Sequence, residues 1–118
     1  MKASLAETLD YIQIFYDKLI QMQSDYLIKA KLNGKWGYID YKGNVFIKLV
    51  YDEIDQPWNG MIMVKKDGKS GYFNDKGKLV IPCKYDLANP FTEAGKAMIM
   101  LDGKNGVVSK DGSVKFFN

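Results

Sequence analysis

The sequence contains no histidine, no arginine and only one cysteine among its 118 residues. Histidine is the commonest general base and metal ligand near neutral pH, so its absence argues against both kinds of site. The lone Cys83 can form neither an internal disulfide nor a thiolate metal cluster, and after Pro82 it is expected to pack as a small apolar residue. We therefore expect a protein that is not an enzyme and that carries no metal and no cofactor.

Carboxylates are present, and they are densest at Asp52, Glu53 and Asp55. Two carboxyl groups facing one cleft are what a glycosidase requires. Asp52, however, recurs as Asp86 at the same place in a repeat, which favours hydrogen bonding in a turn over catalysis.

The 17 basic residues are all lysine, and the net charge is +3. Arginine is the preferred side chain for phosphate and for guanine edges, so its absence argues against sequence-specific nucleic-acid recognition. Many of the lysines lie close to turn glycines, where solubility and the protection of sheet edges explain them. Weak electrostatic binding of nucleic acid is kept as a second alternative function.

Long hydrophobic runs are missing as well. No stretch approaches the roughly 20 apolar residues that span a bilayer, and Glu7, Asp10 and Asp17 interrupt the segment where a signal peptide would lie. We expect a single cytoplasmic domain covering residues 1–118.

The first segment has apolar side chains at helical spacing, including Leu5, Leu9 and Ile12, with Ile14 as an exception on the polar side. Ser4 and Glu7 have the spacing of a capping box. This pattern predicts an amphipathic helix over residues 4–23, which would cap the rest of the fold or dock a partner.

The remainder is a threefold repeat. Its units are Asn33-Gly34-Lys35-Trp36-Gly37-Tyr38-Ile39-Asp40, Asp67-Gly68-Lys69-Ser70-Gly71-Tyr72-Phe73-Asn74 and Asp102-Gly103-Lys104-Asn105-Gly106-Val107-Val108-Ser109. The period is 34 residues from Gly34 to Gly68 and 35 from Gly68 to Gly103. Repeats of this length are small units that bury their apolar faces by stacking on one another.

Each unit contains two turn signals. Asn-Gly or Asp-Gly predicts a type I′ hairpin turn with positive φ at both residues, and a second turn ends on a glycine three residues after Asp, Asn or Ser. The expected turn glycines are Gly34, Gly43, Gly68, Gly77, Gly103 and Gly112. The expected strands are 27–32, 35–40 and 45–47, then 62–66, 70–74 and 79–81, then 98–101, 105–109 and 114–116.

Tyr-Asp segments and proline-aromatic pairs join the units. Pro57-Trp58 and Pro90-Phe91 are interpreted as equivalent, so Trp58 and Phe91 are expected to be packing wedges between units. The third unit is truncated, since no Tyr-Asp segment follows Phe116. Its last strand edge would be covered, paired, or offered to a second copy in a homodimer.

These residues resemble the WG-repeat family, also called KWG repeats, over residues 27–118. The resemblance is carried by Gly34-Lys35-Trp36-Gly37-Tyr38-Ile39-Asp40 with Gly43, Ile47, Tyr51 and Asp52. Ser70 and Asn105 replace the tryptophan in the later units. The family implies bacterial β-hairpin arrays that mediate interactions, and it brings no catalytic residues.

The expected fold is therefore mainly β, an antiparallel β-hairpin repeat array with an N-terminal helix, and a closed β-trefoil-like or barrel arrangement is the alternative. The expected function is non-enzymatic protein binding of the adaptor, immunity or inhibitor type. Binding of a small molecule or glycan between repeats is the first alternative. The candidate contact residues, provided that they are exposed, are Tyr38, Tyr41, Trp58, Tyr72 and Phe91.

Overall fold

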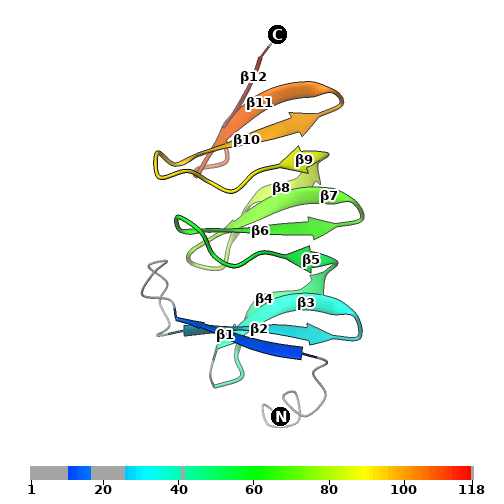
Figure 1. Ribbon diagram of the computed structural model, residues 1–118, viewed down its shortest axis with the longest axis vertical. Helices are drawn as coiled ribbons and strands as arrows, with labels where there is room; N and C mark the ends of the chain where they lie inside the picture. Colours follow the sequence, from blue (N-terminus) through cyan, green and yellow to red (C-terminus); the bar gives the residue numbers. More distant parts are fainter. Residues whose placement is uncertain (1–10, 17–25, 41, 118) are drawn as a thin grey trace.

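The computed structural model describes residues 11–16, 26–40 and 42–117, and these form an open stack of three antiparallel β-sheets (Figure 1). The stack is elongated, with extents of 51 × 29 × 17 Å. Strand β1 lies near one end and strand β12 at the other, so the described residues do not close into a trefoil or a barrel. The alternative closed arrangement is therefore wrong.

Each sheet has four strands. The first contains β1 (Tyr11–Tyr16), β2 (Tyr26–Leu32), β3 (Lys35–Asp40) and β4 (Val45–Tyr51). The second contains β5 (Glu53–Ile54), β6 (Met61–Lys66), β7 (Lys69–Asn74) and β8 (Leu79–Tyr85). The third contains β9 (Leu87–Ala88), β10 (Lys96–Leu101), β11 (Lys104–Ser109) and β12 (Val114–Phe116).

The expected helix is wrong at residues 11–16, which form β1 and pair antiparallel with residues 26–31 of β2. This segment is rich in isoleucine, tyrosine and phenylalanine, which favour strands. It also occupies the edge that β5 and β9 occupy in the later sheets, because Ile12 lies opposite Ala30 as Ile54 lies opposite Val64. An open sheet edge next to the first hairpin thus selects the strand. The rest of the expected helix lies outside the described residues.

The two short strands β5 and β9 were not expected. Each follows a Tyr-Asp segment and pairs with the first strand of the next hairpin, so one unit supplies the edge strand of its successor. The last strand of the first two units is also longer than predicted and runs on to Tyr51 and Tyr85. In the third unit β12 forms the outer edge with all three residues exposed, and self-association through it stays a prediction.

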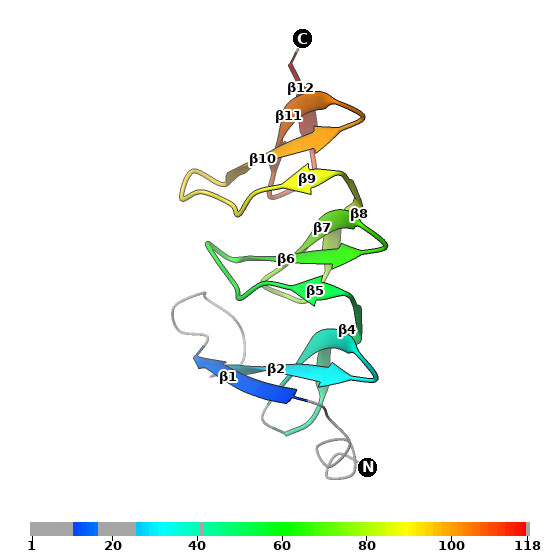
Figure 2. The ribbon, with the colours of Figure 1, turned by 45° about the vertical axis from the view of Figure 1, so that its right-hand side comes forward.

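The hairpin turns have the local geometry that their sequences predict. Asn33 and Gly34 have φ of 52° and 79°, and the Asp-Gly pairs at 67–68 and 102–103 repeat these values. Positive φ at both central residues is the type I′ condition. These turns lie along one side of the stack, and the loops between β5 and β6 and between β9 and β10 lie along the other (Figure 2).

Gly37 and Gly71 mark close approach of two strands at a β-bulge. The pairing of β3 with β4 shifts register around Gly37, and the pairing of β7 with β8 shifts around Gly71. A Cβ atom on Gly71 would lie 2.4 Å from the carbonyl oxygen of Ile81. Only glycine fits such a position without moving the neighbouring strand.

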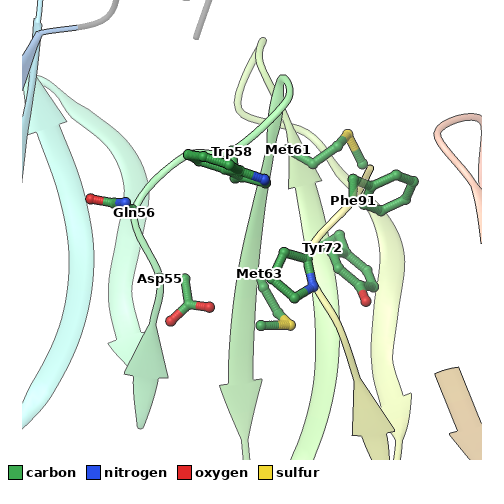
Figure 3. A pocket seen from close by; sticks show the side chains of 8 residues that line it. Asp55, Gln56, Trp58, Met61, Met63, Tyr72 and Phe91 are labelled. Atoms are coloured by element: carbon green, nitrogen blue, oxygen red, sulfur yellow. The ribbon is translucent and has the colours of Figure 1, made fainter. Parts of the chain in front are cut away.

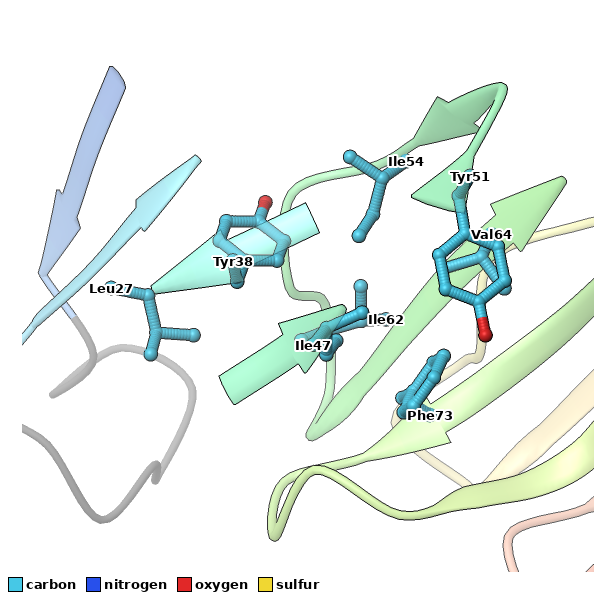
Figure 4. Close-up of a cluster of buried hydrophobic side chains, with 8 residues drawn as sticks. All are labelled: Leu27, Tyr38, Ile47, Tyr51, Ile54, Ile62, Val64 and Phe73. Carbon is cyan, nitrogen blue, oxygen red and sulfur yellow. The ribbon is translucent and has the colours of Figure 1, made fainter. Parts of the chain in front are cut away.

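The core lies between the sheets, where each unit contributes one apolar face to its neighbour. The first cluster joins the first and second sheets and contains Leu27, Tyr38, Ile47, Tyr51, Ile54, Ile62, Val64 and Phe73 (Figure 4). The second joins the second and third sheets and contains Met61, Tyr72, Ile81, Tyr85, Phe91, Ala97, Ile99 and Val108. Stability therefore depends on contacts between neighbouring units, as in other repeat arrays.

Candidate functional site

The structure buries three of the five candidate contact residues. Tyr38 is 0% exposed, and Tyr72 and Phe91 are each 1% exposed. Phe91 meets the ring of Tyr72 edge-on, with 4.9 Å between the ring centroids and an interplanar angle of 84°. These three side chains hold adjacent units together, so they are corrected from contact residues to core residues. Tyr41 lies outside the described residues.

The two buried tyrosines also have their hydroxyl groups satisfied within the fold. Tyr38 donates to the carbonyl oxygen of Asp55 at 2.9 Å, and Tyr72 donates to that of Asn89 at 2.6 Å. Burial is the main cause that raises the pKa of each tyrosine well above its usual value. Each hydroxyl therefore fastens one unit to the segment that leads into the next loop.

These hydrogen bonds correct the assumed equivalence of Trp58 and Phe91. If Asp55 corresponds to Asn89, then two residues further on Pro57 corresponds to Phe91, and both are buried. Trp58 then corresponds to Thr92, and both backbone amides donate across their loops, to Met61 and to Lys96 respectively. The second loop is one residue longer than the first, and its extra residue lies after Thr92, within the turn that leads to Lys96.

Trp58 is consequently not a packing wedge. Its side chain is 54% exposed, and the buried place that the sequence suggested for it belongs to Pro57. Trp58 lies at the start of a tight turn with Asn59 and Gly60, whose φ values are 50° and 80°. A large apolar side chain is thus presented at the surface without a role in the core.

Trp58 borders a groove between the two loops, with a cavity of about 400 Å³. We call it the Trp58 groove, and it is lined by Asp55, Gln56, Trp58, Met61, Met63, Tyr72, Pro90 and Phe91 (Figure 3). The side-chain amide of Asn59 donates to the carbonyl oxygen of Phe91 at 2.7 Å. This hydrogen bond fixes the loop between β5 and β6 against the loop between β9 and β10. The groove is therefore formed by two adjacent repeats and needs both.

A second, smaller hollow of about 130 Å³ shares Asp55 and Met63 with the Trp58 groove. Its remaining lining residues include Glu53, Lys65, Asp86 and Leu87. The two hollows together extend from the loops toward the edge strands β5 and β9.

On the hairpin side, the repeated lysine and aspartate form a clamp between units. Asp52 accepts from the ammonium group of Lys35 and, through its other oxygen, from the backbone amide of Asp67 at 2.8 Å. The same arrangement joins Asp86 to Lys69 and to the amide of Asp102, again at 2.8 Å. The recurrence of these carboxylates is thus structural, which agrees with the hydrogen-bonding role expected for them.

The clamp makes a prediction about acid stability. The hydrogen bond from Lys35 is the first cause that holds the pKa of Asp52 below its usual value, and Lys69 acts likewise on Asp86. A lowered folded-state pKa gives stability that is present above the usual carboxyl range and is lost as the pH falls through the folded-state pKa. We expect Asp52→Asn, which keeps an acceptor for Asp67, to lose less stability than the wild type between pH 7 and pH ~2.5.

Urea unfolding at several pH values measures this difference, with Glu93→Gln as a charge-matched control on an exposed loop. The control is expected to follow the wild-type pH dependence. Equal acid sensitivity of Asp52→Asn and wild type would contradict the assigned clamp.

The tryptophan of the repeat motif is only half-buried, in contrast to the tyrosine two residues later. Trp36 packs against the first core cluster, and the ammonium groups of Lys29 and Lys31 lie 4.7 and 5.2 Å from the centroid of its ring. In the second unit Ser70 takes this place and is buried. Trp36 and Ser70 thus occupy a position at the edge of the core, and neither lines the Trp58 groove.

Metal-ligand clusters and membrane-spanning helices can also be assessed in the described residues. Within residues 11–16, 26–40 and 42–117, no three histidine, cysteine, aspartate or glutamate side chains gather as metal ligands would. The same part of the chain contains no helix with the length and apolarity to cross a membrane.

The fold and its clamps define an open β-repeat protein in which each unit completes its successor. The family model described as "WG containing repeat" matches residues 36–69 and 71–104, which together cover more than half of the chain. The chain therefore belongs to the WG-repeat family, and the resemblance noted in the sequence is confirmed. No curated protein and no solved structure matches the chain.

Proposed function

We propose that this chain is a non-enzymatic protein-binding module whose contact surface is centred on the Trp58 groove. The observation that supports it is the exposure of Trp58 at a position where the next repeat has Thr92 and where the fold requires no aromatic side chain. Tryptophan is among the residues most enriched at interface hot spots, where a large rigid ring fills a recess in the partner.

The surroundings of Trp58 suit such a contact. The partly exposed Met63 adds flexible apolar surface to the groove, and methionine adapts to irregular partner surfaces. The hydrogen bond from Asn59 to Phe91 holds the two loops together, so little ordering is needed on binding.

Affinity capture from a lysate of the native host tests the proposal. We expect the wild type to enrich a specific protein, and Trp58→Ala to lose at least tenfold of that enrichment while its stability stays within about 0.5 kcal/mol of wild type, as for other exposed sites. Phe117→Ala, which removes an exposed aromatic side chain at the far end of the stack, is the matched control. Equal capture by wild type and Trp58→Ala would reject this contact surface.

Binding of a small molecule in the same groove is the second candidate function. The cavity of about 400 Å³ falls within the range of ligand pockets, and most of its lining is apolar. Native mass spectrometry of the purified protein would support this function if it detects a bound molecule that Trp58→Ala no longer retains.

A further inference from the structure

The Trp58 groove has an unusual charge balance for this protein. Among the described residues that line it, Asp55 carries the charge and none is a lysine, although the chain has 17 basic residues. The salt bridges within the described residues involve Asp52, Glu53 and Asp86, and none reaches the carboxylate of Asp55. Within the part of the chain that the structure describes, the groove therefore presents a carboxylate with no cationic partner.

The fold does not require the charge at position 55. The structural role of Asp55 is carried by its backbone, since its carbonyl oxygen accepts from Tyr38 and its amide donates to Met63. The next repeat fulfils the same role with Asn89, whose neutral side chain is also exposed. A carboxylate that replaces a neutral residue at an equivalent place is available for a ligand.

The surroundings of Asp55 indicate which kind of ligand fits. Figure 3 shows both Asp55, just after β5, and Met63, on β6, below the ring of Trp58. An alkyl stem could lie along Met63 and the indole ring, and its cationic end would reach the carboxylate. A neutral apolar occupant would instead strip water from Asp55 without giving it a partner, which is unfavourable.

The adjoining hollow extends the negative surface away from Trp58. Glu53 lines it with an exposed carboxylate that lies 4.0 Å from Lys65, at the limit of a salt bridge. Asp86, also in its lining, is already paired with Lys69. A partner segment leaving the groove in this direction passes Glu53, so a basic segment is favoured over an acidic one.

We propose that the Trp58 groove binds a lysine or arginine side chain of the partner protein, with Asp55 as its counter-ion and the indole of Trp58 as its stacking surface. The inference rests on the proposed protein-binding function and specifies its chemistry. Arginine is expected to bind more tightly than lysine, because a planar guanidinium both stacks on an indole and forms two parallel hydrogen bonds with a carboxylate.

Titration with capped amino acids, followed by nuclear magnetic resonance, tests the charge preference directly. The probes are Nα-acetyl-arginine amide, the corresponding lysine compound, and Nα-acetyl-citrulline amide as the uncharged analogue of arginine. We expect the two cations to shift the indole N–H signal of Trp58. Trp36 provides an internal control, because Lys29 and Lys31 already lie over its ring and its signal is expected to stay in place.

Variants assign the effect to Asp55. Asp55→Asn is expected to weaken arginine-amide binding about fivefold, within the range for a solvent-accessible ion pair supported by an aromatic ring. Glu93→Gln, which removes an exposed carboxylate outside the groove, should leave it unchanged. Equal binding of citrulline and arginine, or an unchanged affinity in Asp55→Asn, would overturn the proposal.

The capture experiment separates this proposal from the proposed function. If a protein is lost with Trp58→Ala but is retained fully by Asp55→Asn, protein binding stands and the cationic side chain is rejected. If arginine amide binds in an Asp55-dependent way and no protein is captured, the charge preference stands and the protein-binding role fails. Loss of the same protein from both variants supports both.

Discussion

Gly71→Ala is expected to destabilise the protein by about 3 kcal/mol or more, the upper part of the range for overpacked sites. The added Cβ would lie 2.4 Å from the oxygen of Ile81, 2.7 Å from the carbonyl carbon of Pro82 and 2.8 Å from the amide nitrogen of Cys83. All three are backbone atoms of β8, so a side-chain rotation cannot relieve the clash. Either β8 moves, or the bulge that joins it to β7 is lost.

The position of β8 explains why that movement is costly. Ile81 and Tyr85 of β8 are buried in the cluster that joins the second and third sheets, so displacing the strand opens this cluster. The loss is a large fraction of the ~5–15 kcal/mol by which a typical domain is stable.

Gly106→Ala is the matched control, because Gly106 occupies the same place in the third unit. Its Cβ would meet the oxygen of Lys115 at 2.7 Å, a looser contact, and β12 is an exposed edge strand that can shift outward. We expect this variant to lose only about 1 kcal/mol. Urea unfolding followed by circular dichroism compares the two, and equal losses would contradict the role given to strand position.

Tyr72→Ala is expected to cost about 3–5 kcal/mol, the usual loss for a large buried aromatic side chain. The substitution removes the ring that packs edge-on against Phe91 and leaves the carbonyl oxygen of Asn89 without its donor. Because Tyr72 lies between the second and third sheets, the third unit should separate first. Proteolysis is then expected to cut near the loop before β10 at lower urea concentrations than in the wild type.

Tyr72→Phe distinguishes packing from hydrogen bonding at this position. It keeps the ring and removes only the hydroxyl, so we expect a loss of about 1 kcal/mol and an intact groove. A folded, fully stable Tyr72→Ala variant with weakened partner binding would return Tyr72 to the contact surface.

Much of the local structure could be predicted from the sequence, because it depends on residues close together in the chain. Asn33-Gly34 and its two counterparts predict type I′ turns since few other residues accept positive φ at both positions. The bulge at Gly71 is indicated by a glycine inside a strand pattern. The 34–35-residue period, and with it the stacked array and the family, follow from the recurrence of such local signals.

The segment 11–16 shows where local pattern fails. Its apolar residues fit a helical period apart from Ile14, and a six-residue run rich in isoleucine and aromatic residues fits a strand equally well. The choice between helix and strand depends on β2, because its open edge can pair with this segment. Ile14 was the signal in the sequence that favoured the strand.

The candidate site was decided by tertiary structure. Tyr38 and Tyr72 lie in predicted strands, and Trp58 and Phe91 lie in the segments between units. The sequence alone does not tell which of these four aromatic side chains is exposed. The distinction comes from hydrogen bonds of the two tyrosines to residues 17 positions further on, which set the register of the loops. That register places Pro57 inside and Trp58 outside.

The sequence by itself thus determined the repeat, its turns and its family, because steric limits on φ and the spacing of glycines act over a few residues. Only the tertiary structure decided which strand completes the first sheet, which aromatic side chain is exposed, and that Asp55 lies beside it with no lysine among the described residues that line the groove. Those properties depend on how one unit meets the next, and a one-residue offset of the proline-aromatic pair along the loop is enough to exchange a buried position for an exposed one.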